Sequence, residues 1–158
     1  MAWRIALKDV QLALRASAAA GLALAIAETL ELQHPIYAMI AAVIATDLSP
    51  AESRKLALRR LAATAAGAFC GALLSASLGP GPLPAALSIF AAMLVSSLLH
   101  AQEGARVAGY ICGLVVLYHG EEPWTYAYFR FVETILGIAI AVLISAVPKL
   151  LRHREPAP

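Results

Sequence analysis

Six apolar segments, separated by connections rich in proline and glycine, constrain this chain more than any other feature of its sequence. A helix needs roughly 20 predominantly apolar residues to cross the hydrocarbon core of a bilayer. Because lipid offers no partner to backbone polar groups, such segments must be helical. The sequence therefore predicts an all-α, polytopic integral membrane protein with six transmembrane helices. The segments span residues 16–32, 35–46, 61–78, 83–99, 107–118 and 131–147.

Composition favours the same class. Apolar residues make up 61% of the 158 residues and charged residues 14%, against roughly 45–50% and 25% in soluble domains. A mean hydropathy of +0.76 argues against an ordinary soluble enzyme and excludes a disordered chain and a nucleic-acid binder. No catalytic or metal-binding motif occurs, so we expect no enzyme activity, no catalytic residue, no metal and no cofactor.

The basic residues predict the orientation of the chain in the membrane. With both termini in the cytoplasm, only Arg130 of the 12 Lys and Arg residues falls on the outer side. Since cytoplasmic loops carry the excess of Lys and Arg, this bias favours six spans with cytoplasmic ends. The basic residues expected at the cytoplasmic face are Arg4, Lys8, Arg15, Arg54, Lys55, Arg59, Arg60, Arg106, Lys149, Arg152 and Arg154.

The first 15 residues have a different pattern. Arg4, Lys8, Gln11 and Arg15 recur at helical spacing on one face, which predicts a short amphipathic helix on the cytoplasmic membrane surface before the first span. A cleaved signal peptide is the alternative, because residues 25–27 have the small-x-small form of a cleavage site. We expect one transmembrane domain over residues 1–158. It divides into an interfacial helix (1–15), two three-helix units (16–78 and 83–147) and a cytoplasmic tail (148–158).

An internal repeat relates the two three-helix units. Residues 60–67 and 130–137 both read R-x-x-x-T-x-x-G and are 70 residues apart. Three helices per repeat is an odd number, so the second copy must enter the membrane from the opposite side. This is the inverted-topology repeat of many secondary transporters. The second and fifth apolar segments are short and occupy equivalent places, which points either to a binding site near the membrane midplane or to helices that end early.

The repeated motif places an arginine, a threonine and small residues on one face of each helix. The glycines let another helix approach closely. Each arginine is expected at a helix N-terminus, and a guanidinium group there suits a carboxylate, which it binds with two hydrogen bonds. Anchoring at the membrane surface is the alternative for Arg60. The residues are Arg60, Thr64, Gly67 and Gly71 in the first motif and Arg130, Thr134 and Gly137 in the second.

Carboxylates within or near the spans are candidates for carrying a proton, because an acid in the membrane is costly and usually functional. The candidates are Glu133, Glu28 and Asp47. A salt bridge with Arg130, one helical turn away, is the structural alternative for Glu133. Asp47 could instead pair with a nearby arginine.

Aromatic residues crowd the expected outer loop before the sixth segment. They predict an interfacial aromatic belt, with a stacking platform for aromatic substrates as the alternative. His34, at the end of the first segment, is expected at the interface as well. The aromatic residues are Trp124, Tyr126, Tyr128 and Phe129.

Residues 35–46, followed by Ser53 and by residues 59–67, resemble the aromatic acid exporter superfamily, which includes the fusaric acid resistance-like proteins. Trp124 and residues 130–137 fit the same pattern in the second half. The resemblance covers residues 12–152, although Ala63 stands where the family often has glycine. It implies a half-size unit in the bacterial inner membrane that assembles as a homo-oligomer, most simply a dimer.

Residues and resemblance together predict a transporter that exports organic anions, in particular aromatic carboxylic acids, with possible proton coupling. Arg60 and Arg130 would attract the anion at opposite ends of the path, Thr64 and Thr134 would supply hydroxyl groups, and one of the three acids would carry the proton. An anion channel of the same fold and a non-transporting membrane scaffold are the alternatives. The expected partners are the lipid bilayer, a small organic anion and a second copy of the chain, but no nucleic acid.

Overall fold

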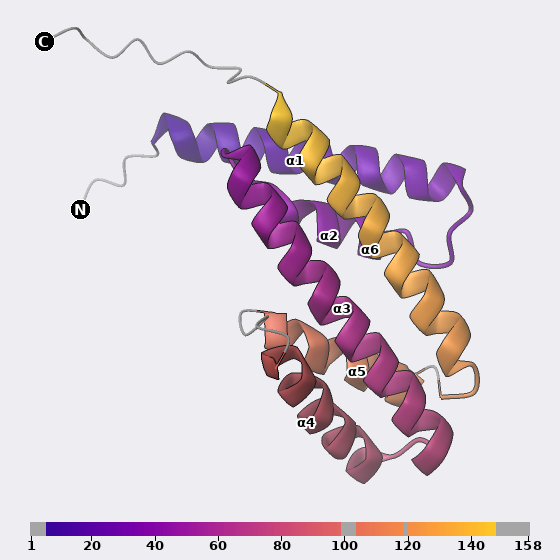
Figure 1. Ribbon diagram of the computed structural model, residues 1–158. Coiled ribbons are helices and arrows are strands. Elements are labelled where there is room, and N and C mark those ends of the chain that lie inside the picture. Colours follow the sequence, from indigo (N-terminus) through magenta and orange to yellow (C-terminus); the bar gives the residue numbers. More distant parts are fainter. Residues whose placement is uncertain (1–5, 99–103, 119, 148–158) are drawn as a thin grey trace, which may run out of the picture.

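The computed structural model describes residues 6–98, 104–118 and 120–147, and it contains only helices in these ranges. This confirms the all-α expectation. The expected cytoplasmic tail (148–158) and the start of the expected interfacial helix (1–5) lie outside the described residues. The helices are α1 (Leu7–Thr29), α2 (Ile36–Ala45), α3 (Pro50–Leu78), α4 (Pro82–Leu98), α5 (Ala105–Tyr118) and α6 (Pro123–Ala146) (Figure 1).

Helix length separates two groups. Within the described ranges, α1, α3 and α6 are long and apolar enough to cross a membrane, whereas α2, α4 and α5 are shorter. With 10 residues in α2 and 14 in α5, a rise of about 1.5 Å per residue gives lengths of roughly 15 and 21 Å. Both are shorter than a hydrocarbon core of about 30 Å. The structure thus contains three helices that are long enough to cross a membrane within the described residues. That all six helices cross the membrane remains a prediction.

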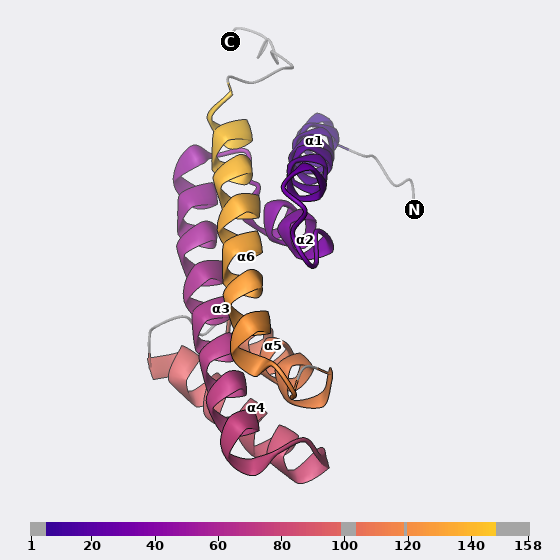
Figure 2. The ribbon, with the colours of Figure 1, turned by 90° about the vertical axis from the view of Figure 1, so that its right-hand side faces the viewer.

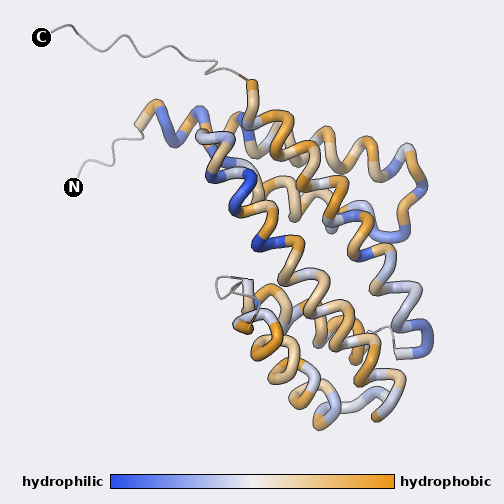
Figure 3. The backbone as a smooth tube through the Cα atoms, in the orientation of Figure 1, coloured by the Kyte–Doolittle hydropathy of each residue, from blue (hydrophilic) through white to orange (hydrophobic). Residues whose placement is uncertain are grey.

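The two longest apolar helices, α3 and α6, pack against each other and form the centre of the molecule (Figures 1 and 2). α1 and α2 pack on α6, and α4 and α5 pack on α3. Figure 3 shows that hydrophilic residues gather in the connections, in the first part of α1 and in the first half of α3, while most other helical residues are apolar. Large apolar side chains are exposed on all six helices. Such a surface suits lipid rather than water.

Small residues let the short helices approach the central pair closely. A Cβ atom on Gly67 of α3 would collide with the backbone carbonyl of Ala108 on α5. A Cβ atom on Gly137 of α6 would collide with the backbone carbonyl of Ala38 on α2. The two alanines are separated by the same 70 residues as the two glycines. Gly71 adds to the first contact, because a Cβ there would lie 2.9 Å from the Cβ of Val115.

The first helix corrects one expectation. α1 runs without interruption from Leu7 to Thr29, so the expected boundary between an interfacial helix ending at residue 15 and a span starting at residue 16 is wrong. The later part of its polar face points inward, whereas Lys8 near the start of the helix is exposed. Gln11 and Arg15 are buried, and a stripe of buried alanines continues the same face along the helix.

Arg15 explains why this polar face turns toward the protein. Its guanidinium donates hydrogen bonds to the carbonyl oxygens of Val147 at 2.6 Å, Leu48 at 3.3 Å and Ser145 at 3.4 Å. Ser145 and Val147 lie at the C-terminal end of α6. A cation is favourable at this end of a helix, where carbonyl groups lack helical partners. Arg15 therefore fixes α1 to α6 and to the α2–α3 connection.

Candidate functional site

The two arginines of the repeated motif lie inside long helices. α3 begins at Pro50 and α6 begins at Pro123, because proline suits the first helical turn, where its missing N–H is not needed. Arg60 therefore lies about three turns into α3 and Arg130 about two turns into α6. The expectation that each arginine sits at a helix N-terminus is wrong, since charged residues extend α3 and aromatic residues extend α6 beyond the apolar segments.

The same two arginines meet at one side chain, Tyr110 of α5. Nη2 of Arg60 donates a hydrogen bond to the Tyr110 hydroxyl oxygen at 2.7 Å, and Nη2 of Arg130 donates to the same oxygen at 3.2 Å. The arginine side chains are only 3% and 1% exposed, respectively. The expectation that they lie at opposite ends of the path is therefore wrong, because the packing of α3 on α6 brings them together.

Arg130 also lies on an aromatic face. The central carbon of its guanidinium is 3.3 Å from the centre of the Tyr37 ring, a cation–π contact. Each arginine thus contacts a tyrosine from a short helix in the other half of the chain: Arg60 contacts Tyr110 of α5, and Arg130 contacts Tyr37 of α2. We call these four residues the arginine site.

The arginine site has unused hydrogen-bond donors. The buried Nε and Nη1 atoms of both Arg60 and Arg130 have no hydrogen-bond partner among the described residues. Neither guanidinium lies within 4.0 Å of a carboxylate in that part of the chain. Buried donors normally have partners, and a buried charge without a counter-charge is costly. The arrangement is suited to an anion that would satisfy both guanidinium groups.

The threonines of the motif differ in their hydrogen bonds. Thr64 is fully buried next to the turn of Arg60, and its hydroxyl has no partner in the described structure. The hydroxyl of Thr134 donates to the carbonyl oxygen of Arg130 at 2.8 Å, within its own helix. Only the Thr64 hydroxyl therefore retains its hydrogen for a further acceptor.

Glu133 lies one turn from Arg130 on α6 and is fully buried. Its Oε1 accepts a hydrogen bond from the backbone N–H of His34 at 2.7 Å, while its Oε2 has no partner among the described residues. It makes no ion pair with Arg130 within 4.0 Å in that region, so the salt-bridge alternative is wrong. Glu133 instead holds the start of α2 against α6.

The other two candidate acids are elsewhere. Glu28 is exposed on α1. Asp47 is partly buried in the α2–α3 connection, where its Oδ1 accepts the backbone N–H of Ser49 at 2.8 Å. Its own backbone N–H donates to the hydroxyl of Ser145. Asp47 thus organises the start of α3, and neither acid joins the arginine site.

Aromatic rings connect the arginine site with the connection between α1 and α2. The hydroxyl of Tyr126 donates to that of Tyr37 at 3.0 Å. The ring of His34 packs on both, with centroids 5.6 Å from Tyr37 and 5.3 Å from Tyr126. Tyr126 is buried, so it does not belong to the interfacial aromatic belt, whereas Trp124 and Tyr128 are exposed on the same helix.

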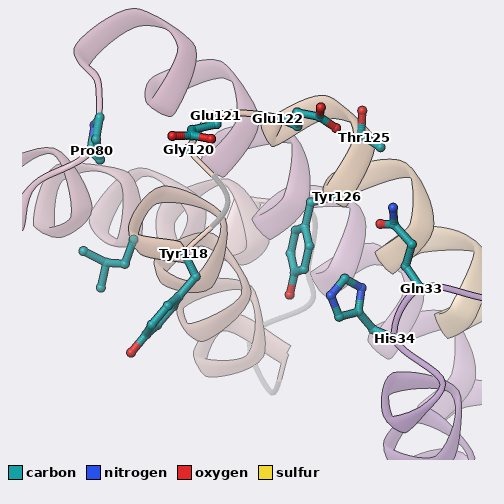
Figure 4. A pocket seen from close by; sticks show the side chains of 10 residues that line it. Gln33, His34, Pro80, Tyr118, Gly120, Glu121, Glu122, Thr125 and Tyr126 are labelled. Carbon is teal, nitrogen blue, oxygen red and sulfur yellow. The ribbon is translucent and has the colours of Figure 1, made fainter.

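A cavity of about 670 Å³ lies on the other side of these rings. It forms where the α1–α2, α3–α4 and α5–α6 connections converge along one side of the molecule (Figure 1). Figure 4 shows His34 and Tyr126 next to each other in its wall, with Glu121 and Glu122 along its edge. The rings of Tyr37 and Tyr126 thus stand between this cavity and Arg130. Burial, and then the charge of Arg130, lower the pKa of His34, which favours its neutral form.

Sequence reasoning missed three residues of this region: Tyr37, Tyr110 and His34. Each tyrosine counts as apolar in a span, so the hydropathy pattern treated it as membrane-facing. The available signal was their position, because Tyr37 and Tyr110 lie in the two short segments that occupy equivalent places in the halves of the chain. A polar tip on an otherwise apolar short helix requires a hydrogen-bond partner.

An all-helical chain with span-length apolar helices around two buried guanidinium groups defines a membrane protein with a cationic interior. The family follows from sequence comparison. The chain belongs to the family described as "Fusaric acid resistance protein-like", which it matches over residues 22–144. This confirms the resemblance to that family and indicates membrane transport at the level of the family. Among curated proteins and among solved structures, no match was found.

Proposed function

We propose that this protein exports small organic anions from the cytoplasm and that the arginine site binds the anionic group. One observation carries the proposal: two buried guanidinium groups share a neutral acceptor and have no carboxylate partner among the described residues. Charge-assisted hydrogen bonds from arginine are among the strongest that a protein makes to carboxylates. The free hydroxyl of Thr64 adds a further donor close to Arg60.

Aromatic carboxylates are the proposed substrate class. The rings of Tyr126 and His34 lie between Tyr37 of the arginine site and the cavity, and aromatic rings favour stacked or edge-to-face contacts with one another. The family description supports the same class, because fusaric acid is a pyridine ring that carries a carboxyl group.

Six membrane passages in two inverted halves are the proposed architecture. The matched contacts Gly67–Ala108 and Gly137–Ala38 support it. The two glycines are 70 residues apart in the sequence, and so are the two alanines. The two halves then share one site, as in transporters built from inverted repeats, where short or interrupted helices mark the binding region. The three connections around the cavity would face outward, and the cavity would be the exit toward the outer side.

Glu133 is the proposed carrier of a coupling proton. It is buried, it has one oxygen without a partner among the described residues, and it holds His34 beside the rings that separate cavity and arginine site. Gain or loss of a proton at Glu133 would change the charge next to Arg130 and the hydrogen bond to the start of α2.

Counterflow of labelled benzoate in proteoliposomes tests the proposal. Vesicles loaded with unlabelled benzoate should accumulate the label transiently, beyond the uptake of protein-free vesicles. Arg130→Gln and Arg60→Gln should each weaken benzoate affinity roughly ten- to hundred-fold, the effect of losing one hydrogen bond to a charged group. Arg54→Gln is the matched control, because Arg54 is exposed on the same helix as Arg60.

Each outcome selects one function. Benzoate flux that follows voltage but shows no counterflow would identify an anion channel. Absence of any flux from well-folded protein would leave the scaffold alternative. Unchanged affinity in folded Arg60→Gln and Arg130→Gln would refute the arginine site as the place where the anion binds.

A further inference from the structure

Tyr110 differs from the other residues of the arginine site in its exposure. Its side chain is 41% exposed, whereas those of Arg60 and Arg130 are almost completely buried. It extends from an exposed position on α5 to the buried guanidinium groups. Tyr110 therefore covers two buried cations with a side chain that is itself partly exposed.

The chemistry at this point is that of a weak acceptor between two strong donors. A phenol oxygen is neutral, and it accepts N–H groups from both arginines at 2.7 and 3.2 Å. A carboxylate oxygen at the same position would carry a negative charge, so its bonds to the same two cationic groups would be stronger than those of the neutral phenol. A tyrosine side chain with a partly exposed ring can rotate away about its χ1 bond without movement of the helix backbone.

We propose that the Tyr110 hydroxyl occupies the position of the substrate's anionic oxygen and is displaced when the anion binds. This inference rests on the proposed function of the arginine site. Tyr110 competes with the anion, so it lowers the affinity and, by returning to the arginines, speeds release. It also sets specificity: a neutral analogue offers the arginines only another neutral oxygen and gains little by displacing Tyr110, whereas a carboxylate gains an ion pair with them.

Titration calorimetry of the purified full chain with benzoate and with benzamide, its neutral analogue, tests this inference. Tyr110→Phe keeps the ring and removes the competing oxygen. It should bind benzoate at least about ten-fold more tightly, because in the unaltered protein benzoate must displace a hydroxyl that accepts from two charged guanidinium groups. Its preference for benzoate over benzamide should fall, because benzamide no longer competes with a resident hydroxyl. Tyr128→Phe, an exposed tyrosine on α6, is the matched control and should leave both affinities unchanged.

Weaker benzoate binding by Tyr110→Phe would overturn the inference, because the hydroxyl would then be a ligand of the anion. Unchanged binding would overturn it as well. The arginine variants test the proposed function separately. If Arg60→Gln and Arg130→Gln lose benzoate binding, the proposed function stands even when Tyr110→Phe gives one of the two contrary results. If Tyr110→Phe does not fold, fluorotyrosine at position 110 of the otherwise unchanged protein gives a second measurement. Benzoate, but not benzamide, should shift the fluorine resonance of this residue. An unchanged resonance at saturating benzoate would refute the displacement of Tyr110.

Discussion

Glu133 is the buried carboxylate beside the arginine site, and at the scale of single residues it allows a sharp test of proton coupling. Glu133→Gln retains an oxygen that can accept the N–H of His34, so the start of α2 should stay in place. The variant cannot release a proton. We expect benzoate counterflow at equal pH on both sides to persist and its stimulation by a pH gradient to disappear.

Glu28→Gln is the matched control for this test, because Glu28 is exposed on α1 whereas Glu133 is fully buried. Its pH-gradient stimulation should match that of the unaltered protein. Stimulation that survives Glu133→Gln and is lost in Glu28→Gln would assign the coupling proton to α1 instead.

His34 predicts how stability depends on pH. Burial and the charge of Arg130 lower the pKa of His34 from its ordinary value of 6.5. Between the folded pKa and 6.5 the unfolded chain binds more protons than the folded one, so stability falls as the pH drops from 6.5 through this window. In detergent, the melting temperature should decrease on acidification below 6.5, and His34→Gln should show a smaller decrease. An equal decrease in both proteins would contradict the prediction.

Sequence patterns predict the role of a single residue well where its chemistry is unusual for its surroundings. They predict it poorly where the residue type is common in both roles. An arginine in an apolar helix is rare and usually functional, so the repeated motif identified Arg60 and Arg130 as candidates. A tyrosine in such a helix can face lipid or pack in the interior, and only the fold shows that Tyr110 contacts both guanidinium groups. The meeting of the arginines depends on how α3 crosses α6, which no local pattern encodes.

At the scale of helices, the close contact between α6 and α2 depends on Gly137. A Cβ at this position would lie 2.8 Å from the Cβ of Ala41 and would also collide with the backbone of Ala38. Since backbone atoms cannot rotate away, Gly137→Ala should force the helices apart and destabilise the fold by about 1–3 kcal/mol. Thermal melting in detergent measures the loss.

Gly21 provides the matched control within another helix. No atom lies within 4 Å of a Cβ built at this position, and alanine is the better helix former by roughly 0.5–1 kcal/mol. Gly21→Ala should therefore keep or raise the melting temperature. If both variants melt at the same temperature as the unaltered protein, the packing contact does not limit stability.

Helix boundaries show where sequence reasoning succeeds and fails. The expected ends of the second and fourth segments agree with α2 and α4 to within about one residue, because proline and apolar content mark them well. The expected starts of α1, α3 and α6 are about two to three turns late. Charged residues interrupted the apolar count at the start of α1 and α3, although Lys, Arg and Glu are good helix formers and continue the helix. At the start of α6, aromatic residues were interpreted as an interfacial belt before the span.

At the scale of the whole molecule, the proposed topology predicts which positions are accessible from outside. Glu121→Cys, at the edge of the cavity, should react with a membrane-impermeant maleimide in intact cells, and Ala51→Cys at the start of α3 should react only after lysis. The native Cys70 and Cys112 are buried and should add little background. Labelling of both positions from the same side would remove the six-span topology and the inverted repeat together.

The contacts of the arginine site cross between the two halves of the chain, and this has a consequence for inheritance. Arg60 is encoded in the first half of the gene and Tyr110 in the second, while Tyr37 and Arg130 have the reverse order. A mutation of one of these residues therefore changes the contacts of a residue in the other half. Natural selection must act on both halves jointly, and we expect a change at Tyr37 to persist in descendants only where Arg130 has changed with it.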